Sequence, residues 1–123
     1  RIDLLLQPAP EADDQRPIYV EIKNTTWSAA DLALFPDTVT ERGQKHLEEL
    51  MHVFPDARAV LIPCVSRSDV TRFAPGDSAY PRYGELFREA IDAGVEVIPC
   101  QFSFAVDAVR FEGVLPVQRT ESG

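Results

Sequence analysis

Glu21 and Lys23 stand two residues apart in a stretch of β-forming residues. Because side chains alternate along a strand, both point to the same face of it. Asp3 interrupts an earlier apolar run, residues 2–6, in a similar way. If the two stretches pair as a hairpin, Asp3 lies beside Glu21. Two neighbouring carboxylates repel each other unless a divalent cation lies between them, so this spacing predicts a metal site.

Two acids and a lysine make a workable site for phosphodiester hydrolysis. A divalent cation, Mg²⁺ or Mn²⁺, polarises the phosphoryl oxygen and lowers the pKa of a bound water. Asp3 and Glu21 are the expected metal ligands, and Lys23 would hold the attacking water or neutralise a phosphate. Asp3, Glu21 and Lys23 are therefore the candidate catalytic residues of a metal-dependent nuclease. The alternative is a solvated charge pair on an exposed strand.

Arg42, Lys45 and His46 fall about one turn apart on a predicted helix, residues 38–54. Their charge and hydrogen-bonding groups suit contacts with the phosphates of a nucleic acid, DNA or RNA. The alternative is a solvated polar face. His46 could also serve as a general base, although the sequence shows no acidic partner for it.

The elements that must position these residues follow from hydrophobic periodicity. Strands are predicted at 2–6, 18–23, 58–65, 95–104 and 111–117, helices at 38–54 and 82–93, and loops at 24–36 and 66–81. Strand–helix–strand units favour parallel pairing and right-handed crossovers. The predicted fold is therefore α/β, with a mixed sheet that begins with a β-hairpin and carries helices on its faces.

The first predicted helix has an apolar stripe and two candidate caps. The stripe consists of Leu47, Leu50, Met51 and Phe54. Thr38 and Glu41 stand three residues apart, as in a capping box. Asp37 is either an alternative cap or a third acid near the metal, and a capping role is the favoured interpretation. Gly94 is in the position of a C-terminal cap for the second helix.

Size and composition limit the classes of protein that this chain can represent. Its 123 residues fit one domain, and a net charge of −8 argues against binding nucleic acid by bulk positive charge. No apolar run approaches the roughly 20 residues that span a bilayer. The chain begins at Arg1 without a Met, so we expect a piece of a longer protein.

The only two cysteines are Cys64 and Cys100. Two are too few for a disulfide-stapled secreted scaffold, so a reduced, cytoplasmic protein is expected. They could form a bridge if their strands are neighbours. Buried free thiols are the favoured interpretation.

Several blocks of sequence resemble one family. They read Y-V-E-I-K-N at 19–24, F-P-D-T-V-T-E-R-G-Q-K-H-L at 35–47 and E-L-F-R-E-A-I-D-A-G-V-E-V at 85–97. In this order they resemble the sugar fermentation stimulation protein A (SfsA) family. The resemblance runs over nearly the whole chain, and the second block is long enough to be specific.

The resemblance implies a fold and a function. Members pair an N-terminal OB-like domain with a C-terminal domain similar to PD-(D/E)xK nucleases, which has a restriction-endonuclease-like core. This chain would be one nuclease-like domain over residues 1–123, without the OB-like domain. The polar composition of its end predicts a flexible tail at 118–123. The acid of the nuclease motif falls on Asp3, and its (D/E)xK falls on Glu21 and Lys23. The helix and strand that usually precede this motif are missing here.

The family is prokaryotic, and it is described as DNA-binding and linked to expression of maltose-metabolism genes. Three interpretations therefore remain open. The chain is a Mg²⁺-dependent nuclease, or a DNA-binding regulator that keeps the site without cleaving. In the third, the acid–lysine group is only a polar edge of the sheet.

Overall fold

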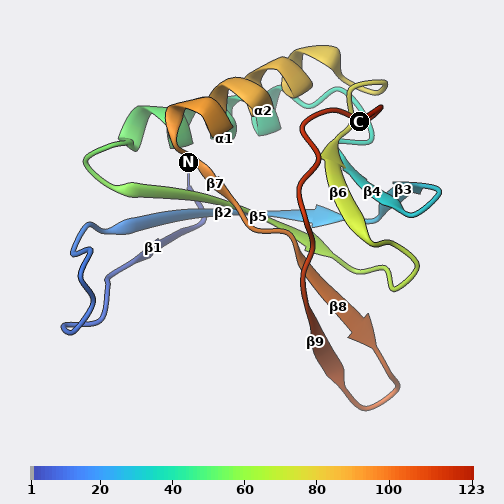
Figure 1. The fold of residues 1–123 in the computed structure, drawn as a ribbon, viewed down its shortest axis with the longest axis horizontal. Helices are drawn as coiled ribbons and strands as arrows, with labels where there is room; N and C mark the ends of the chain where they lie inside the picture. The colour runs from blue at the N-terminus through green and yellow to red at the C-terminus, as the bar shows by residue number, and fades with distance from the viewer. Residues whose placement is uncertain (1) are drawn as a thin grey trace.

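The computed structural model describes residues 2–123, which form two sheets and two helices (Figure 1). The larger sheet contains β1 (Leu4–Leu6), β2 (Ile18–Thr25), β5 (Arg58–Val65), β7 (Glu96–Val97), β8 (Cys100–Phe104) and β9 (Val109–Val114). The smaller sheet contains β3 (Trp27–Ala29), β4 (Leu32–Phe35) and β6 (Arg72–Pro75). The helices are α1 (Glu41–Val53) and α2 (Pro81–Ala93).

The larger sheet is mixed and runs in the order β1-β2-β5-β8-β9, with β7 also beside β5. β1 and β2 are antiparallel, with Leu4 opposite Val20, so the predicted N-terminal hairpin is confirmed. β2 and β5 are parallel over their full lengths, and α1 is the crossover between them. β8 and β9 form a second hairpin, which projects away from the body of the molecule (Figure 1).

Both helices lie on the same side of the larger sheet (Figure 1). Leu47 and Leu50 of α1 and Phe87 of α2 pack with Leu61 of β5 in one core. The sequence predicted helices on the faces of the sheet, and the structure corrects this, because both helices lie on one face. The physical reason is that the chain moves across the sheet in one direction, from β2 to β5 to β8. Right-handed crossovers that advance in one direction place their helices on one side.

The smaller sheet occupies stretches that the sequence predicted to be loops. β3 and β4 pair antiparallel. β4 pairs in parallel with β6, and Leu32 is opposite Arg72, 40 positions further along the chain. These strands are three or four residues long, too short to show an alternating pattern. Pairing between distant segments stabilises them, together with burial of Leu32, Leu34 and Ala74.

The N-terminus of α1 differs from the sequence prediction. Thr40, not Thr38 or Asp37, is the N-cap, with φ −139° and ψ 97°. Its Oγ1 accepts a hydrogen bond of 3.0 Å from the backbone N–H of Gly43. At the C-terminus of α2, Gly94 has φ 116° and donates its N–H to the carbonyls of Ala90 and Ile91, which confirms it as the cap.

The C-terminal third also departs from the predicted boundaries. The strand predicted at 95–104 is divided into β7 and β8, with Pro99 between them where the ladder loses a donor. The last strand is β9, Val109–Val114, rather than 111–117. No described helix is long and apolar enough to cross a membrane.

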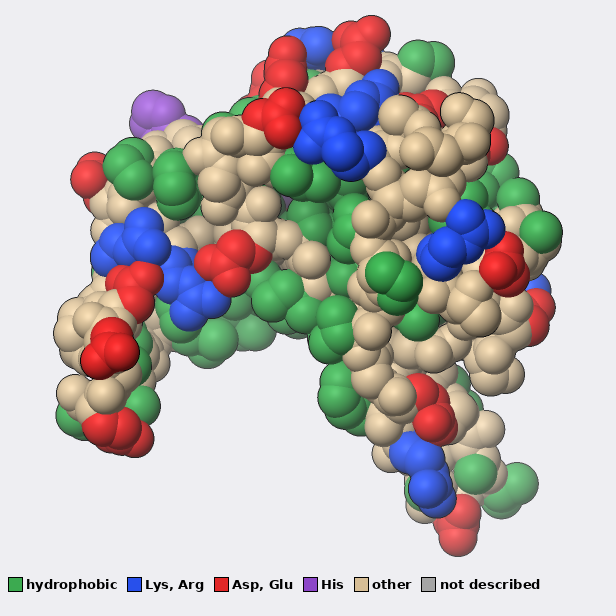
Figure 2. All heavy atoms as spheres, viewed as in Figure 1, with side chains coloured by type: hydrophobic (Ala, Val, Ile, Leu, Met, Phe, Trp, Pro, Cys, Tyr) green, Lys and Arg blue, Asp and Glu red, His purple; other side chains and the backbone are tan. Residues whose placement is uncertain are grey.

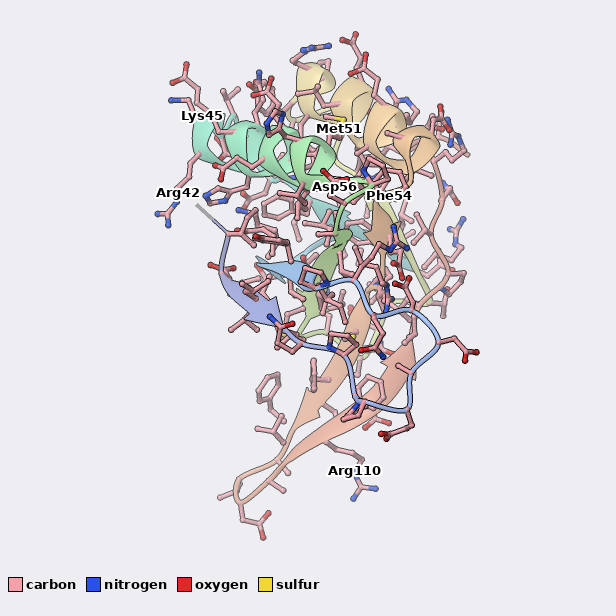
Figure 3. All side chains as sticks on the ribbon, turned by 90° about the vertical axis from the view of Figure 1, so that its left-hand side faces the viewer. Arg42, Lys45, Met51, Phe54, Asp56 and Arg110 are labelled. Atoms are coloured by element: carbon pink, nitrogen blue, oxygen red, sulfur yellow. The ribbon has the colours of Figure 1, made fainter. Side chains whose placement is uncertain are left out.

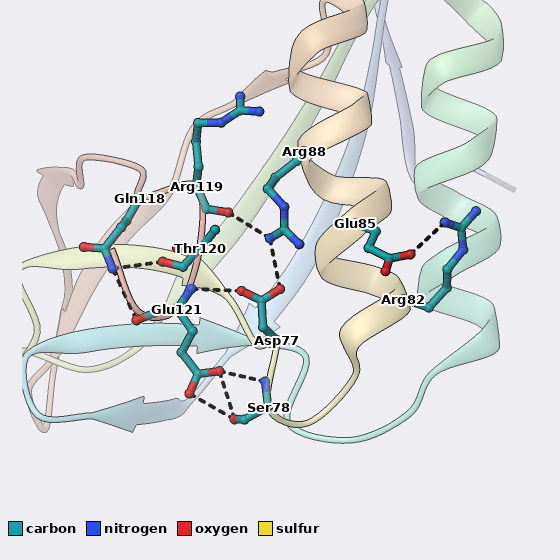
Figure 4. Close-up of polar contacts among 9 residues, drawn as sticks. All are labelled: Asp77, Ser78, Arg82, Glu85, Arg88, Gln118, Arg119, Thr120 and Glu121. Carbon is teal, nitrogen blue, oxygen red and sulfur yellow. Dashed lines mark hydrogen bonds and ion pairs between the residues drawn. The ribbon is translucent and has the colours of Figure 1, made fainter.

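Residues 118–123, for which composition suggests a flexible tail, make side-chain contacts with the body of the domain (Figure 4). Arg119 forms an ion pair of 2.9 Å with Asp92 of α2. The Glu121 carboxylate accepts hydrogen bonds of 2.9 Å from the N–H and hydroxyl of Ser78. These contacts do not support the expectation of a loose tail, because they tie it to α2 and to the loop before it.

Candidate active site

The charged face of β2 is turned toward α1. Glu21 is buried, with 1% of its surface exposed, although it is ionisable. The Lys23 Nζ atom lies 3.1 Å from Glu21 Oε2, and the lysine side chain is largely buried as well. Burying a carboxylate is costly unless it is paired, so this arrangement compensates for the charge that the fold places inside. The interpretation as a solvated pair on an exposed strand is therefore wrong.

Asp3 lies beside Glu21, as the hairpin predicted. Its backbone N–H donates to Glu21 Oε1 over 3.2 Å, and its Oδ2 accepts from the N–H of Ile22 over 2.9 Å. Asp3 precedes β1 and is exposed to solvent. These two hydrogen bonds hold the segment before β1 against β2, so an exposed carboxylate and a buried one lie at the same edge.

His46 is the side chain whose position differs most from the prediction. It is buried, with 5% exposed, and does not lie on a solvated polar face. Its Nδ1 lies 2.8 Å from Glu21 Oε2 and 2.7 Å from Lys23 Nζ. The acidic partner that the sequence did not show is thus Glu21, 25 positions away on β2.

The charge state of His46 follows from its surroundings. Burial lowers its pKa from the ordinary value, and the positive charge of Lys23 lowers it further, while Glu21 acts in the opposite direction. The imidazole is therefore neutral at neutral pH. Its Nδ1 can either accept a hydrogen bond from Lys23 or donate one to Glu21, but it cannot do both at once.

Arg42 and Lys45 are exposed on α1 and leave the helix in different directions (Figure 3). Arg42 is close enough to His46 to contribute to lowering its pKa. Lys45 instead lines a shallow surface depression together with Glu48 and Tyr80. Of the three predicted nucleic-acid contacts, His46 lies inside the site, Arg42 lies near it, and Lys45 lies apart.

Tyr83 of α2 is a further polar group near the site. Its side chain is fully buried, and Glu21 contributes after burial itself to raising the pKa of its phenol. Among the described residues its hydroxyl has no hydrogen-bond partner. No signal in the sequence indicated that α2 would bring a hydroxyl toward β2.

The carboxylates of Asp3 and Glu21 are the type of oxygen ligand that a divalent cation binds, but they do not form a complete coordination shell. Mg²⁺ prefers oxygen ligands, is commonly held by one or two carboxylates and keeps several waters. Asp3 and Glu21 supply such a pair, although Glu21 Oε2 is engaged by Lys23 and His46. Within residues 2–123, no three His, Cys, Asp or Glu side chains form a group that could hold a metal ion.

Asp37 does not cap α1, and it lines a small cavity with Asn24, Thr25 and Trp27 at the C-terminal end of β2, just after Lys23. Cys64 and Cys100 lie opposite each other on neighbouring parallel strands, and both are free thiols. Burial raises the pKa of the Cys100 thiol, and the neighbouring Cys64 raises it further. The two strands are neighbours, as a disulfide would require, but both side chains are free thiols in this structure.

Fold and site together define an α/β protein with mixed sheets, in which a buried Glu–Lys–His group lies between β2 and the first helix. The model of the "Sugar fermentation stimulation protein RE domain" matches residues 1–108. The chain therefore belongs to the SfsA family.

Relatives of known sequence agree with this assignment. The chain is 95% identical over 123 residues to a sugar fermentation stimulation protein homolog of Synechococcus sp. (strain RCC307), and covers 49% of that protein. It is 63% identical over 120 residues to the homolog of Prochlorococcus marinus (strain NATL2A), covering 98% of this chain and 46% of the relative. The chain thus spans about half the length of the curated relatives that it matches.

A solved structure is similar in fold as well as in sequence. It is "The structure of Pyrococcus Furiosus SfsA in complex with Ca2+", which matches with a TM-score of 0.79 and 26% identity. The match covers 96% of this chain and 55% of that one. The α/β architecture with two helices and mixed sheets is thereby confirmed.

Proposed function

We propose that this chain is a metal-dependent nuclease-type domain that acts on nucleic acid, most naturally DNA. The observation that carries the proposal is the buried Glu21 carboxylate, which lies between Lys23 and His46 with Asp3 beside it. A fold does not require an ion of this kind in its interior, and replacing such groups by apolar residues is often neutral or stabilising. Retaining them is typical of a site that does chemistry.

The proposal gives each residue a role. Asp3 and Glu21 would hold the cation, which when bound supplies Lewis-acid polarisation of a phosphoryl oxygen. Lys23 Nζ offers three donors and a fixed charge to a phosphate or a water. Neutral His46, in the tautomer with its proton on Nε2, would accept from Lys23 at Nδ1 and so orient the ammonium. The Ca²⁺ bound by the Pyrococcus relative supports a divalent cation here, and Mg²⁺ or Mn²⁺ is proposed for catalysis.

The finer parts of the assignment belong to the same proposal. The core would be of the restriction-endonuclease type, and the domain would be the C-terminal half of the longer protein. The other half, an OB-like domain, would contribute affinity for DNA, since the net charge of this chain is −8. The two free cysteines are in line with the reducing cytoplasm.

A second candidate is a DNA-binding regulator of sugar-metabolism genes that does not cleave. It is favoured by the contacts of Glu21, because Oε2 lies 3.1 Å from Lys23 Nζ and 2.8 Å from His46 Nδ1. In that protein, Lys23 would neutralise the Glu21 carboxylate and His46 would only hydrogen-bond to the pair, so that the group would not serve to bind metal.

The deciding experiment uses the full-length protein. Mg²⁺ and Mn²⁺ are titrated calorimetrically into wild type, Glu21→Gln and the control Glu48→Gln, whose side chain is exposed on α1. The same samples are assayed for plasmid nicking. Metal uptake and nicking that Glu21→Gln loses and Glu48→Gln keeps support the nuclease.

Clean DNA binding without metal uptake or nicking supports the regulator instead. Lys23→Ala then separates the remaining possibilities. It should abolish nicking by a nuclease and weaken DNA binding by a regulator only modestly. If Lys23 is merely part of a polar edge, neither activity changes.

A further inference from the structure

The face of the larger sheet opposite the helices is apolar and in part uncovered, although Val20 and Val60 on this face are buried. Hydrophobic side chains gather in the hollow between the loop after β1 and the projecting β8–β9 hairpin (Figure 2). Exposed members of this face are Leu4 (45%), Leu6 (45%), Ile22 (41%), Phe104 (62%), Phe111 (56%) and Val114 (57%). We call these six residues the open face.

Strand alternation and register place these residues on one side. Glu21 points toward α1, so Ile22 points away from the helices. Leu4 is opposite Val20, which has the same parity as Ile22. In the hairpin, Cys100 is opposite both Cys64 of β5 and Val114 of β9, so the open face continues from the sheet onto β8 and β9.

The hairpin extends this face with aromatic side chains. The rings of Phe102 and Phe111 pack with their centroids 5.6 Å apart, and Val109 is opposite Phe104 at the far end. A two-stranded hairpin that leaves the body of a domain is marginally stable by itself. Its outermost aliphatic and aromatic side chains are therefore placed where a packing partner would stabilise it.

Two features make the exposed part of this face unusual. β2 and β5 pair in parallel, and parallel strands are normally covered on both faces. β1 is also an edge strand, and all three of its leucines are exposed. Beside it, a cavity of about 590 Å³ is lined mainly by apolar residues, including Ile2, Leu5 and Val53. The edge strand β1 thus has an apolar cavity on its helix side, toward α1, and the open face on its other side.

We propose that the open face is the docking surface for the other half of the polypeptide, the part that the longer relatives carry outside this region. A relative that is 95% identical over 123 residues contains this region as 49% of its length, so a segment of equal size is available. That segment is tethered to this one, which gives it a high effective concentration at the face. The inference is independent of the proposed catalytic activity.

Docking would also affect the candidate active site through β2. Ile22 lies between Glu21 and Lys23 on the same strand, and its N–H is held by Asp3 Oδ2. A partner packed on Ile22 would therefore restrict the backbone that carries both charged residues. The open face and the site are the two sides of one strand.

The first test is hydroxyl-radical footprinting, read by mass spectrometry, on the full-length Synechococcus relative. Phe104 and Val39 are equally exposed in this domain, at 62% and 61%, but Val39 lies before α1 and off the open face. When each rate is divided by the intrinsic reactivity of its side-chain type, we expect Phe104, Phe111, Leu4 and Leu6 to be oxidised several-fold more slowly than Val39 at every protein concentration. Equal reactivity overturns the proposal, and protection that disappears on dilution overturns it in favour of a second copy.

The second test compares Phe104→Asp with the matched variant Val39→Asp in the same full-length protein. If the open face is buried by the other half, Phe104→Asp lowers the melting temperature by several degrees and restores rapid oxidation of Phe111. Val39→Asp changes neither. Equal melting temperatures for the two variants would show that nothing packs on Phe104. Neither residue touches the Glu21 group, so nicking activity is not the readout.

Discussion

The Nδ1 atom of His46 lies 2.7 Å from the Nζ atom of Lys23, although the two residues are 23 positions apart on different elements. The same Nδ1 lies 2.8 Å from Glu21 Oε2. Because Lys23 can only donate and Glu21 can only accept, the protonation of one ring nitrogen decides which contact is a hydrogen bond. Stability and charge at this site are therefore coupled through His46.

Breaking the Glu21–Lys23 pair should be more harmful than removing both members. Lys23→Met leaves a carboxylate that is 1% exposed without its cation, and we expect a loss of about 3 kcal/mol in the free energy of unfolding. The double variant Glu21→Gln/Lys23→Met should recover most of it. Urea unfolding of wild type, Lys23→Met, Glu21→Gln and the double variant gives the coupling energy between the two side chains. Strictly additive losses of the free energy of unfolding would contradict a buried pair.

The free energy of unfolding should fall as the pH is lowered below about 6.5. Burial lowers the pKa of His46 in the folded state, so the unfolded chain takes up its proton first. The stability that the neutral imidazole contributes is complete above the unfolded pKa. As the pH falls from the unfolded-state pKa to the lowered pKa of the folded state, this contribution to the free energy of unfolding declines. Below the folded-state pKa it no longer changes.

This dependence is checked by urea unfolding between pH 7.5 and pH 5. His46→Gln should flatten the profile in that window, whereas His52→Gln, on the exposed side of α1, should leave the wild-type slope. An unchanged slope in His46→Gln would assign the loss to other groups.

Arg42 should contribute more to nucleic-acid binding than Lys45. Arg42 is near His46 and the Glu21 group, whereas Lys45 is beside Glu48 on a different part of the surface. In the full-length protein, Arg42→Ala should weaken DNA affinity for all sequences and reduce the slope of log K against log salt by about 1. Lys45→Ala should change both quantities less. Equal effects of the two variants would place the DNA along the outer face of α1.

Thr40→Ala should cost about 1 kcal/mol, because the Gly43 N–H loses its acceptor at the first turn of α1. Thr38→Ala is the matched control. Thr38 is exposed and does not cap the helix, so its removal should change the free energy of unfolding by less than about 0.5 kcal/mol. The reverse order in chemical denaturation would restore the capping box with Glu41.

Gly94→Ala and Gly113→Ala separate backbone strain from a steric clash. Both glycines have positive φ, 116° and 133°, so each alanine is strained by about 1–2 kcal/mol. A Cβ at Gly94 would also lie 2.4 Å from the Phe54 ring, whereas at Gly113 nothing lies within 4 Å. The Gly94 variant should therefore have the lower melting temperature by several degrees. Similar melting temperatures would mean that Phe54 moves aside at little cost.

The amino-acid sequence by itself determined the local structure that depends on short-range pattern. The strands β2 and β5, the helices α1 and α2, the apolar stripe of α1 and the glycine cap at Gly94 were all predicted within a few residues. The juxtaposition of Asp3 and Glu21 also followed from the sequence, because a hairpin is a local contact with a simple register.

The tertiary structure decided what depends on contacts between distant segments. The smaller sheet joins strands about 40 positions apart, and short strands gain their stability from such pairing rather than from their own pattern. The placement of both helices on one face depends on the direction in which the strands are added. His46 belongs to the site only because the crossover through α1 carries it over β2, where burial and Glu21 determine its charge.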